Sequence, residues 1–489
     1  MGLNDNTPTR RTFLSVSAAA TAAATVLPAA AAAAPSLSAS AELDGAELAG
    51  GGVGDLGGPG RPITPQRPDA QLRSLLRDID PARVEATVRR LAAFGTRHTL
   101  STQDDPVRGI GAARDWIFAQ LSAYAAESGG RMTVEVQSYL QPVASRIPVP
   151  TVISNIVATV HGQTSPDRVY VITGHYDSRV TDVMNATGDA PGADDDASGV
   201  AVVLELARVM ATRPSAATIV LAAVAGEEQG LYGSAYLAQQ LKANGADVQG
   251  MVSNDIVGSP IGDDGVRHDR LVRMFAEGVP TAETAAEAAT RRSIGGENDS
   301  VSRQLARYAL ATAQNEHTGM NIRLVYRRDR YLRGSDHISF LNLGYPGCRF
   351  TEPREDFAHQ HQDVRVENGV QYGDLPEFCD FRYIARVAKV NAALFWSLAQ
   401  APGTPKAVKI DTSALTNKST LRWTRGSEPD LVGYEIVWRE SSAPDWTHVV
   451  EVGDVTTATI DLSKDNVQFG VRAVDQAGRR SPAAAPTPA

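Results

Sequence analysis

The stretch that decides the fold consists of VYVITGHYDS (residues 169–178), PGADDDASG (residues 191–199) and IVLAAVAGEEQGLYG (residues 219–233). Two apolar runs in it, 169–173 and 219–224, are bounded by glycine and predict buried parallel strands with a helix between them. Strands that alternate with helices are typical of a doubly wound α/β sheet. Open sheets of this kind place their sites beyond the carboxyl ends of the strands, so the polar residues that follow the two runs are the first candidates for chemistry.

The composition sets limits on the class of protein. With 489 residues, of which 43% are hydrophobic, the chain can bury a large core and form more than one domain. The net charge of -9, without a cluster of basic residues, argues against a nucleic-acid partner. Two cysteines, Cys348 and Cys379, can form one disulfide in an oxidising compartment, but the sequence does not show whether they lie close together.

The amino terminus predicts export. The motif TRRTFL (residues 9–14) precedes an alanine-rich apolar stretch that ends in AAAAAAPS, which is typical of a twin-arginine signal peptide over residues 1–34. A membrane anchor fits less well, because Pro28 interrupts the stretch and it falls short of about 20 strongly apolar residues. We therefore expect a secreted protein without a membrane anchor.

Changes in composition divide the rest of the chain. Residues 35–68 are rich in Ala, Gly, Pro and Ser and predict a flexible linker, whereas residues 69–400 carry the α/β pattern of a catalytic domain. Residues 401–407 (APGTPKA) predict a second linker. Over residues 408–484 the apolar period changes to two, which predicts a small all-β sandwich.

Within residues 69–400 the periodicity predicts a mixed sheet covered by amphipathic helices. Residues 258–298 are rich in Gly, Asp and Glu and predict a long irregular excursion, after which Asp299 is expected to cap a helix. The expected strands are 132–139, 152–160, 169–173, 219–224, 250–257, 320–326 and 347–351, and the expected helices include 199–210, 234–243, 300–313 and 378–398.

Five side chains in this domain are candidate metal ligands: His175, Asp195, Glu228, Asp255 and His359. Four of them follow predicted strands and are expected at one rim of the sheet. Imidazole and carboxylate donors together suit zinc. Five ligands are too many for one catalytic zinc, which takes about three plus water, but they suit two Zn²⁺ ions that share a bridging carboxylate. On chemistry alone, Asp194 or Asp196 can also be the bridge.

The motifs GHYDS, PGADDDASGVA, AGEEQGLYGS, SNDIVG and FAHQHQD, in this order, resemble metallopeptidase family 28, which contains co-catalytic di-zinc exopeptidases and chiefly secreted bacterial aminopeptidases. The resemblance covers roughly residues 70 to 400 and implies a zinc-exopeptidase fold. It implies that Asp195 bridges the two ions. His175 and Asp255 would then complete the ligands of one ion, and Glu228 and His359 those of the other. His359 is preferred to His361 because the family shows a histidine four residues before an aspartate, here Asp363.

Two further residues, Glu227 and Asp177, are expected to take part in the chemistry of the site. The resemblance implies that Glu227 is the general base, because it adjoins a ligand and can take a proton from metal-bound water and return it to the leaving amine. Its structural alternative is a carboxylate that stabilises a helix N-terminus. Asp177 lies two residues past His175, on the same side of an extended chain, and is expected to orient the imidazole.

These observations favour a secreted zinc-dependent aminopeptidase that acts on peptides with a free N-terminus. The alternatives are a carboxypeptidase or a glutaminyl cyclase on the same scaffold, or a non-catalytic binding protein. Residues GYEIVWRES and VRAVDQAG resemble a fibronectin type III module, for which a carbohydrate or a surface is the expected partner. Asp336 and His337 either line the substrate pocket or cap a short helix.

Overall fold

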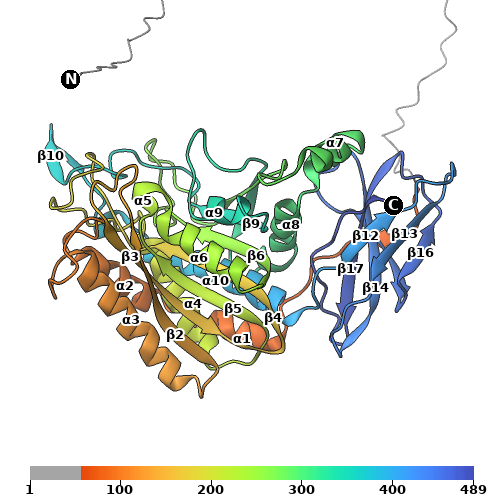
Figure 1. Cartoon of the computed structure of the whole chain (residues 1–489), viewed down its shortest axis with the longest axis horizontal. Coiled ribbons are helices and arrows are strands. Elements are labelled where there is room, and N and C mark those ends of the chain that lie inside the picture. The colour runs from red at the N-terminus through yellow and green to blue at the C-terminus, as the bar shows by residue number, and fades with distance from the viewer. Residues whose placement is uncertain (1–56) are drawn as a thin grey trace, which may run out of the picture. The chain divides into compact units, whose positions relative to one another are not determined.

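An eight-stranded mixed sheet carries the candidate site, and its central strands run parallel (Figure 1). The spatial order is β2, β3, β5, β4, β6, β9, β7, β8, with β5, β4, β6 and β9 mutually parallel. The strands are β2 (Met132–Gln141), β3 (Thr151–Val160), β4 (Gly162–His175), β5 (Ser215–Val224), β6 (Asp247–Asn254), β7 (Leu271–Ala276), β8 (Asn321–Val325) and β9 (Gly347–Thr351). The mixed α/β sheet expected from the sequence is thus confirmed.

This computed structural model describes residues 57–489, which form one compact unit. The expected signal peptide (1–34) and most of the expected linker that follows it lie outside the described residues. Within residues 57–489, no helix combines the length and the apolar character needed to cross a bilayer.

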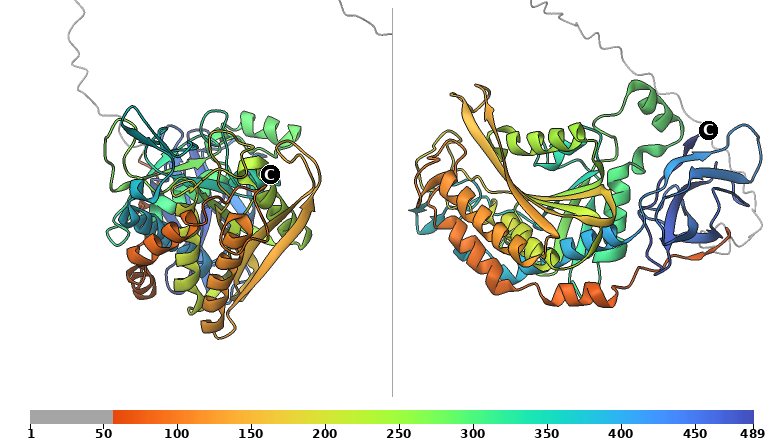
Figure 2. Two further views of the ribbon diagram at one scale, coloured as in Figure 1. Left: turned by 90° about the vertical axis from the view of Figure 1, so that its left-hand side faces the viewer. Right: turned by 60° about the horizontal axis from the view of Figure 1, so that its bottom comes forward.

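Helices cover both faces of the sheet (Figure 2). Successive residues of a strand point to opposite faces, so Tyr170 and Ile172 of β4 join the core under one helical layer, whereas Val169 and Val171 pack with Leu237 on the other. The larger layer contains α1 (Ala70–Arg77), α2 (Pro81–Ala92), α3 (Gly109–Glu127), α4 (Ala197–Ala211), α8 (Val301–Ala313) and α10 (Phe381–Gln400), and the smaller contains α6 (Tyr232–Ala243) and α9 (His337–Leu341).

Two sequence-based expectations differ from the structure. The segment 258–298 is not irregular throughout, because it contains β7, α7 (Ala285–Ser293) and the short 3-10 helix η1 (Gly296–Asn298). The run LVRMFA of β7 is only six residues long and stands among turn residues, so its strand character is easily missed. Helix α8 is capped by Ser300, which accepts from the Arg303 N–H at 3.2 Å, and not by Asp299.

Residues 406–488, here called the C-terminal β-region, contribute strands to two four-stranded sheets. The side chains of Leu421, Tyr434, Ile436, Trp438 and Phe469 form a shared apolar cluster, as the period of two predicts. The strands are β12 (Lys406–Ile410), β13 (Ser419–Thr424), β14 (Leu431–Glu440), β15 (His448–Gly453), β16 (Thr457–Ile460), β17 (Val467–Asp475) and β18 (Thr487–Pro488), and β1 (Arg61–Pro62) adds an edge strand from the other end of the described chain.

Buried ion pairs join the C-terminal β-region to the rest of the unit. Arg439 binds both carboxylate oxygens of Asp299, at 2.9 and 2.8 Å, and Arg307 reaches the same carboxylate at 3.1 Å. All three side chains are buried. A second pair, Arg168 with Glu428 at 2.9 Å, lies at the amino-terminal half of β4. A charge buried this well needs its partner, so these contacts fix the region against the α/β body.

Candidate metal centre

The carboxyl ends of three adjacent strands meet at one rim of the sheet. His175 is the last residue of β4, Asp255 directly follows β6, and Glu227 begins the short helix α5 (Glu227–Gly230) after β5. These strands are neighbours in the order β5, β4, β6. The rim predicted from the sequence is therefore present, at the position where parallel sheets hold their sites.

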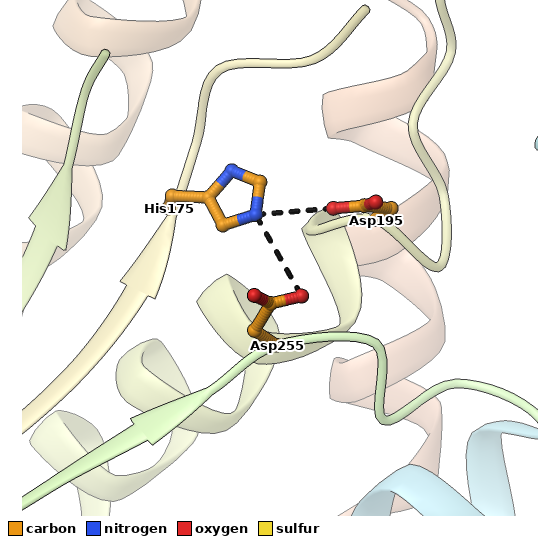
Figure 3. A group of neighbouring side chains, drawn as sticks. All are labelled: His175, Asp195 and Asp255. Atoms are coloured by element: carbon orange, nitrogen blue, oxygen red, sulfur yellow. Dashed lines mark ion pairs between the residues drawn. The ribbon is translucent and has the colours of Figure 1, made fainter. Parts of the chain in front are cut away.

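A first group contains His175, Asp195 and Asp255 (Figure 3). The His175 Nε2 lies 3.0 Å from Asp195 Oδ1 and 3.9 Å from Asp255 Oδ1. All three residues are buried, and the His175 Nε2 has no hydrogen-bond partner. A buried ring nitrogen that faces two carboxylates without a hydrogen bond fits a metal ligand, since a cation between them would satisfy all three groups.

A second group contains Asp195, Glu228 and His361. The His361 Nε2 lies 2.8 Å from Asp195 Oδ2 and 3.0 Å from Glu228 Oε1. Burial acts to lower the pKa of His361, but the charges of Glu228 and Asp195 outweigh it and raise the pKa to about 10. This direction shows that the surrounding potential is negative and favours a cation.

Asp195 belongs to both groups, and a different oxygen of its carboxylate faces each histidine. A carboxylate with this arrangement can bridge two cations, as two-metal hydrolytic sites require. The backbone N–H groups of Asp194 and Asp195 donate to the two carboxylate oxygens of Asp374 at 2.7 and 2.8 Å, which fixes the turn.

The other two aspartates of the DDD run have separate contacts. Asp194 Oδ1 accepts from the Gly258 N–H at 2.6 Å. Asp196 accepts from the His175 N–H at 2.9 Å and, as the N-cap of α4, from the Gly199 N–H at 2.9 Å. The Asp195–Asp196 peptide bond is cis. Of the three, only Asp195 is in position to bridge, so the geometry agrees with the register that the family resemblance implies.

His359 does not join either group. Its ring stacks on Phe378 with the centroids 3.6 Å apart, and its Nδ1 lies 3.4 Å from an oxygen of Asp356. The choice of His359 over His361 is therefore corrected by the structure. His361 has a φ of 54°, in the left-handed region, and the local turn places its ring rather than that of His359 beside Asp195.

Asp177 links the two strand ends. Its carboxylate accepts from the N–H groups of Glu227 and Glu228, at 3.3 and 3.2 Å, and from the Thr99 hydroxyl at 2.9 Å. The His175 Nδ1 lies 3.1 Å from the main-chain oxygen of Asp177 and 3.6 Å from its carboxylate. Asp177 thus lies beside the ring as expected, but its carbonyl makes the hydrogen bond, while its carboxylate holds the segment that carries Glu228.

Glu227 is half-buried, and its carboxylate has no hydrogen-bond partner among the described residues. Burial raises its pKa well above the usual value, with further contributions from Asp255 and Glu228, although His175 acts in the opposite direction. A carboxylate that is unengaged and has a raised pKa suits proton transfer near neutral pH.

The structure also reveals contacts that sequence reasoning missed. Arg179 donates to Glu228 Oε2 at 2.9 Å, and Arg349 lies 3.1 Å from Asp255 Oδ1. Asp336 and His337, considered as pocket residues, are both buried. Arginines give no motif of their own, so their partners become visible only in three dimensions.

The cysteines do not form a disulfide in this structure. Cys348 is buried in β9 and donates through its thiol to the Ser302 main-chain oxygen at 3.3 Å, and Cys379 is also free. Burial raises the pKa of the Cys348 thiol, which makes it a poor nucleophile.

Two overlapping groups of imidazole and carboxylate donors at a strand-end rim suit a metal-dependent hydrolase. Residues 155–368 match the model of peptidase family M28. The chain is 56% identical over 429 residues to a "Probable zinc metalloprotease" of Pyrenophora teres f. teres, covering 87% of this chain and 89% of the relative. It is 57% identical over 435 residues to a protein of the same description from Pyricularia oryzae, covering 88% and 87% of the two chains.

The chain therefore belongs to peptidase family M28. Among solved structures, the Legionella pneumophila LapA aminopeptidase is similar at 17% identity, with a TM-score of 0.47 and coverage of 68% of this chain and 78% of that chain.

Proposed function

We propose that this protein is a secreted, zinc-dependent exopeptidase, namely an aminopeptidase that releases N-terminal residues from peptides. The observation that carries the proposal is the position of Asp195, whose two carboxylate oxygens each face one of the two ligand groups. The naming of relatives as probable zinc metalloproteases supports zinc as the metal. The preference for the amino end rests on the resemblance of the motifs to secreted aminopeptidases.

In this proposal the residues divide into two sets that share Asp195. His175 and Asp255 would hold one ion, and Glu228 and His361 would hold the other. Zinc bound there would lower the pKa of its water ligand to about 7.

Glu227 accepts the proton of the attacking water and returns it to the leaving amine. Its unengaged carboxylate, which directly precedes the proposed ligand Glu228 at the rim of the sheet, supports this role. Asp177 keeps Glu227 and Glu228 in place through their backbone N–H groups and presents its carbonyl to the ring of His175.

The decisive experiment measures zinc per chain and hydrolysis of aminoacyl chromogens before and after chelation. Two zinc ions, loss of turnover on chelation and recovery with zinc are expected. N-acetylated chromogens serve as the control, because an aminopeptidase needs the free amine. Hydrolysis of amino-blocked peptides that end in a free carboxylate, without activity on the aminoacyl chromogens, would favour a carboxypeptidase. A single zinc with cyclisation of N-terminal glutamine would indicate a glutaminyl cyclase, and undiminished turnover after exhaustive chelation would refute the proposal.

Export by the twin-arginine route is part of the same proposal and rests on the arginine motif of residues 9–14. Cells that carry the double change Arg10→Lys and Arg11→Lys should retain the protein. Recovery of the mature protein outside those cells would argue against this route.

The C-terminal β-region is proposed to be a fibronectin type III-like module that binds a carbohydrate or a surface. Its alternating strands and its apolar cluster support the module. Comparing cell-wall and polysaccharide binding by the full chain and by a chain lacking residues 403–489 tests the partner, and equal binding by both would refute it.

A further inference from the structure

Arg349 is a fully buried cation next to the candidate metal centre, and it has no assigned role in the proposed reaction. It lies in the middle of β9, and its exposed fraction is 0%. A buried guanidinium is retained only where fixed acceptors surround it. Its partners therefore indicate what it holds in place.

One side of the guanidinium binds Asp255 at two points. The Arg349 Nη2 donates to the main-chain oxygen of Asp255 at 3.1 Å and lies 3.1 Å from the carboxylate atom Oδ1 of the same residue. This Oδ1 is the atom that approaches His175 Nε2. Because both the backbone and the side chain are held, the carboxylate has little freedom to rotate away from the first ligand group.

The other side of the guanidinium binds the segment 326–336, which connects β8 to α9. The Arg349 Nη1 donates to both carboxylate oxygens of Asp329, at 3.2 and 3.3 Å, and reaches the Gly334 carbonyl at 3.4 Å. Asp329 is itself 3% exposed. The planar fork of arginine can span two carboxylates in this way, whereas lysine presents a single point charge.

We propose that Arg349 is a positioning residue that sets the carboxylate of Asp255 for metal binding and ties it to the segment 326–336. This inference rests on the proposed function, since it assumes that Asp255 is a ligand. Partners outside the ligand sphere commonly orient ligands, and their loss typically lowers metal affinity by about 10–100-fold.

The test compares Arg349→Met and Arg349→Lys with the wild type in zinc titrations against a competing chelator, which resolve the two affinities per chain. For Arg349→Met one affinity should fall by about 10–100-fold while the other is unchanged. Arg349→Lys should lie between it and the wild type, because the charge is kept but the fork is lost.

The matched control is Arg168→Met, which also removes a buried arginine from an ion pair but at Glu428, away from the rim. It should keep both zinc affinities even where it lowers the unfolding temperature. If Arg349→Met does not fold, the zinc affinities of Arg349→Lys are compared with those of the wild type instead. An Arg349→Lys variant with both wild-type affinities overturns the positioning role.

The proposed function and the role of Arg349 can be refuted separately. A wild-type chain that binds fewer than two zinc ions refutes the proposed function. A wild-type chain with two ions, together with an Arg349→Met variant that binds both with the same affinity, overturns the inference about Arg349 alone.

Discussion

Replacing His359 and His361 one at a time tests which of them is the metal ligand. The structure places His361 beside Asp195, whereas the spacing in the sequence motif favours His359. His361→Ala removes an imidazole that lies 2.8 and 3.0 Å from the carboxylates of Asp195 and Glu228. His359→Ala removes a ring that is stacked on Phe378 and belongs to neither ligand group. Only the first change should affect metal binding.

The expected magnitudes differ widely. Loss of a partner outside the ligand sphere already costs about 10–100-fold in metal affinity, so loss of His361 itself should cost more than about 100-fold. A 100-fold fall in zinc affinity corresponds to about 2.7 kcal/mol of binding free energy. His359→Ala forfeits an aromatic stack worth about 0.5–1.5 kcal/mol of unfolding free energy and should leave turnover nearly unchanged.

The assay measures zinc affinity, hydrolysis of an aminoacyl chromogen at fixed free zinc, and denaturant unfolding for both variants. If His359→Ala loses zinc and turnover while His361→Ala keeps them, His361 is not the ligand. In that case the spacing to Asp363, and not the turn at His361, would identify the ligand.

Three further predictions concern the base, the C-terminal β-region and pH. Glu227→Gln should retain both zinc ions but lower kcat by about 10²–10⁴-fold, and undiminished turnover would exclude it as the base. Asp299→Ala leaves two buried arginines without their carboxylate partner and should lower the free energy of unfolding in urea by about 3–5 kcal/mol. The control Asp454→Ala, in an exposed ion pair, should lower it by less than about 1 kcal/mol. Equal losses would contradict the difference in burial. Burial acts to raise the pKa of Glu435, but its arginine partners outweigh it and hold the pKa below 4.5. The contribution of Glu435 to stability is thus complete above pH 4.5 and is lost as the pH falls through the lowered pKa. Glu435→Gln should therefore be less stable than the wild type by about 1–3 kcal/mol at pH 7 and nearly as stable as the wild type in acid. Unfolding measured across pH checks this. A stability difference that is independent of pH would contradict the assigned ion pair.

The sequence predicted those parts of the site that the strand topology determines. His175 and Asp255 come at or just after the ends of apolar runs, and Glu228 comes four residues after another, so the order of the strands brings them to one rim. The turn between β4 and α4 carries Asp195, the member of the DDD run that the family motif selects and that belongs to both groups of candidate ligands. Periodicity and strand ends were sufficient in these cases because parallel sheets have few alternative arrangements.

The remaining contacts depend on irregular backbone, which periodicity does not describe. His361 lies between β9 and α10 in a segment whose direction is set by single dihedral angles, including its own positive φ. Arg349 occupies a strand position that sequence alternation marks only as buried. Its two acceptors, Asp255 and Asp329, come from other elements and cannot be paired with it from spacing alone.

The edge strand β1 has a consequence for how the chain is made. Arg61 pairs with Glu451 of β15 across 390 residues, and Trp438 donates to the Pro59 carbonyl at 2.8 Å. A ribosome releases β1 long before β15 has been made, so the pairing of these two strands must wait until residues 448–453 have been synthesised. This sheet therefore closes through a contact of very large sequence separation, the kind of contact that forms slowly in folding.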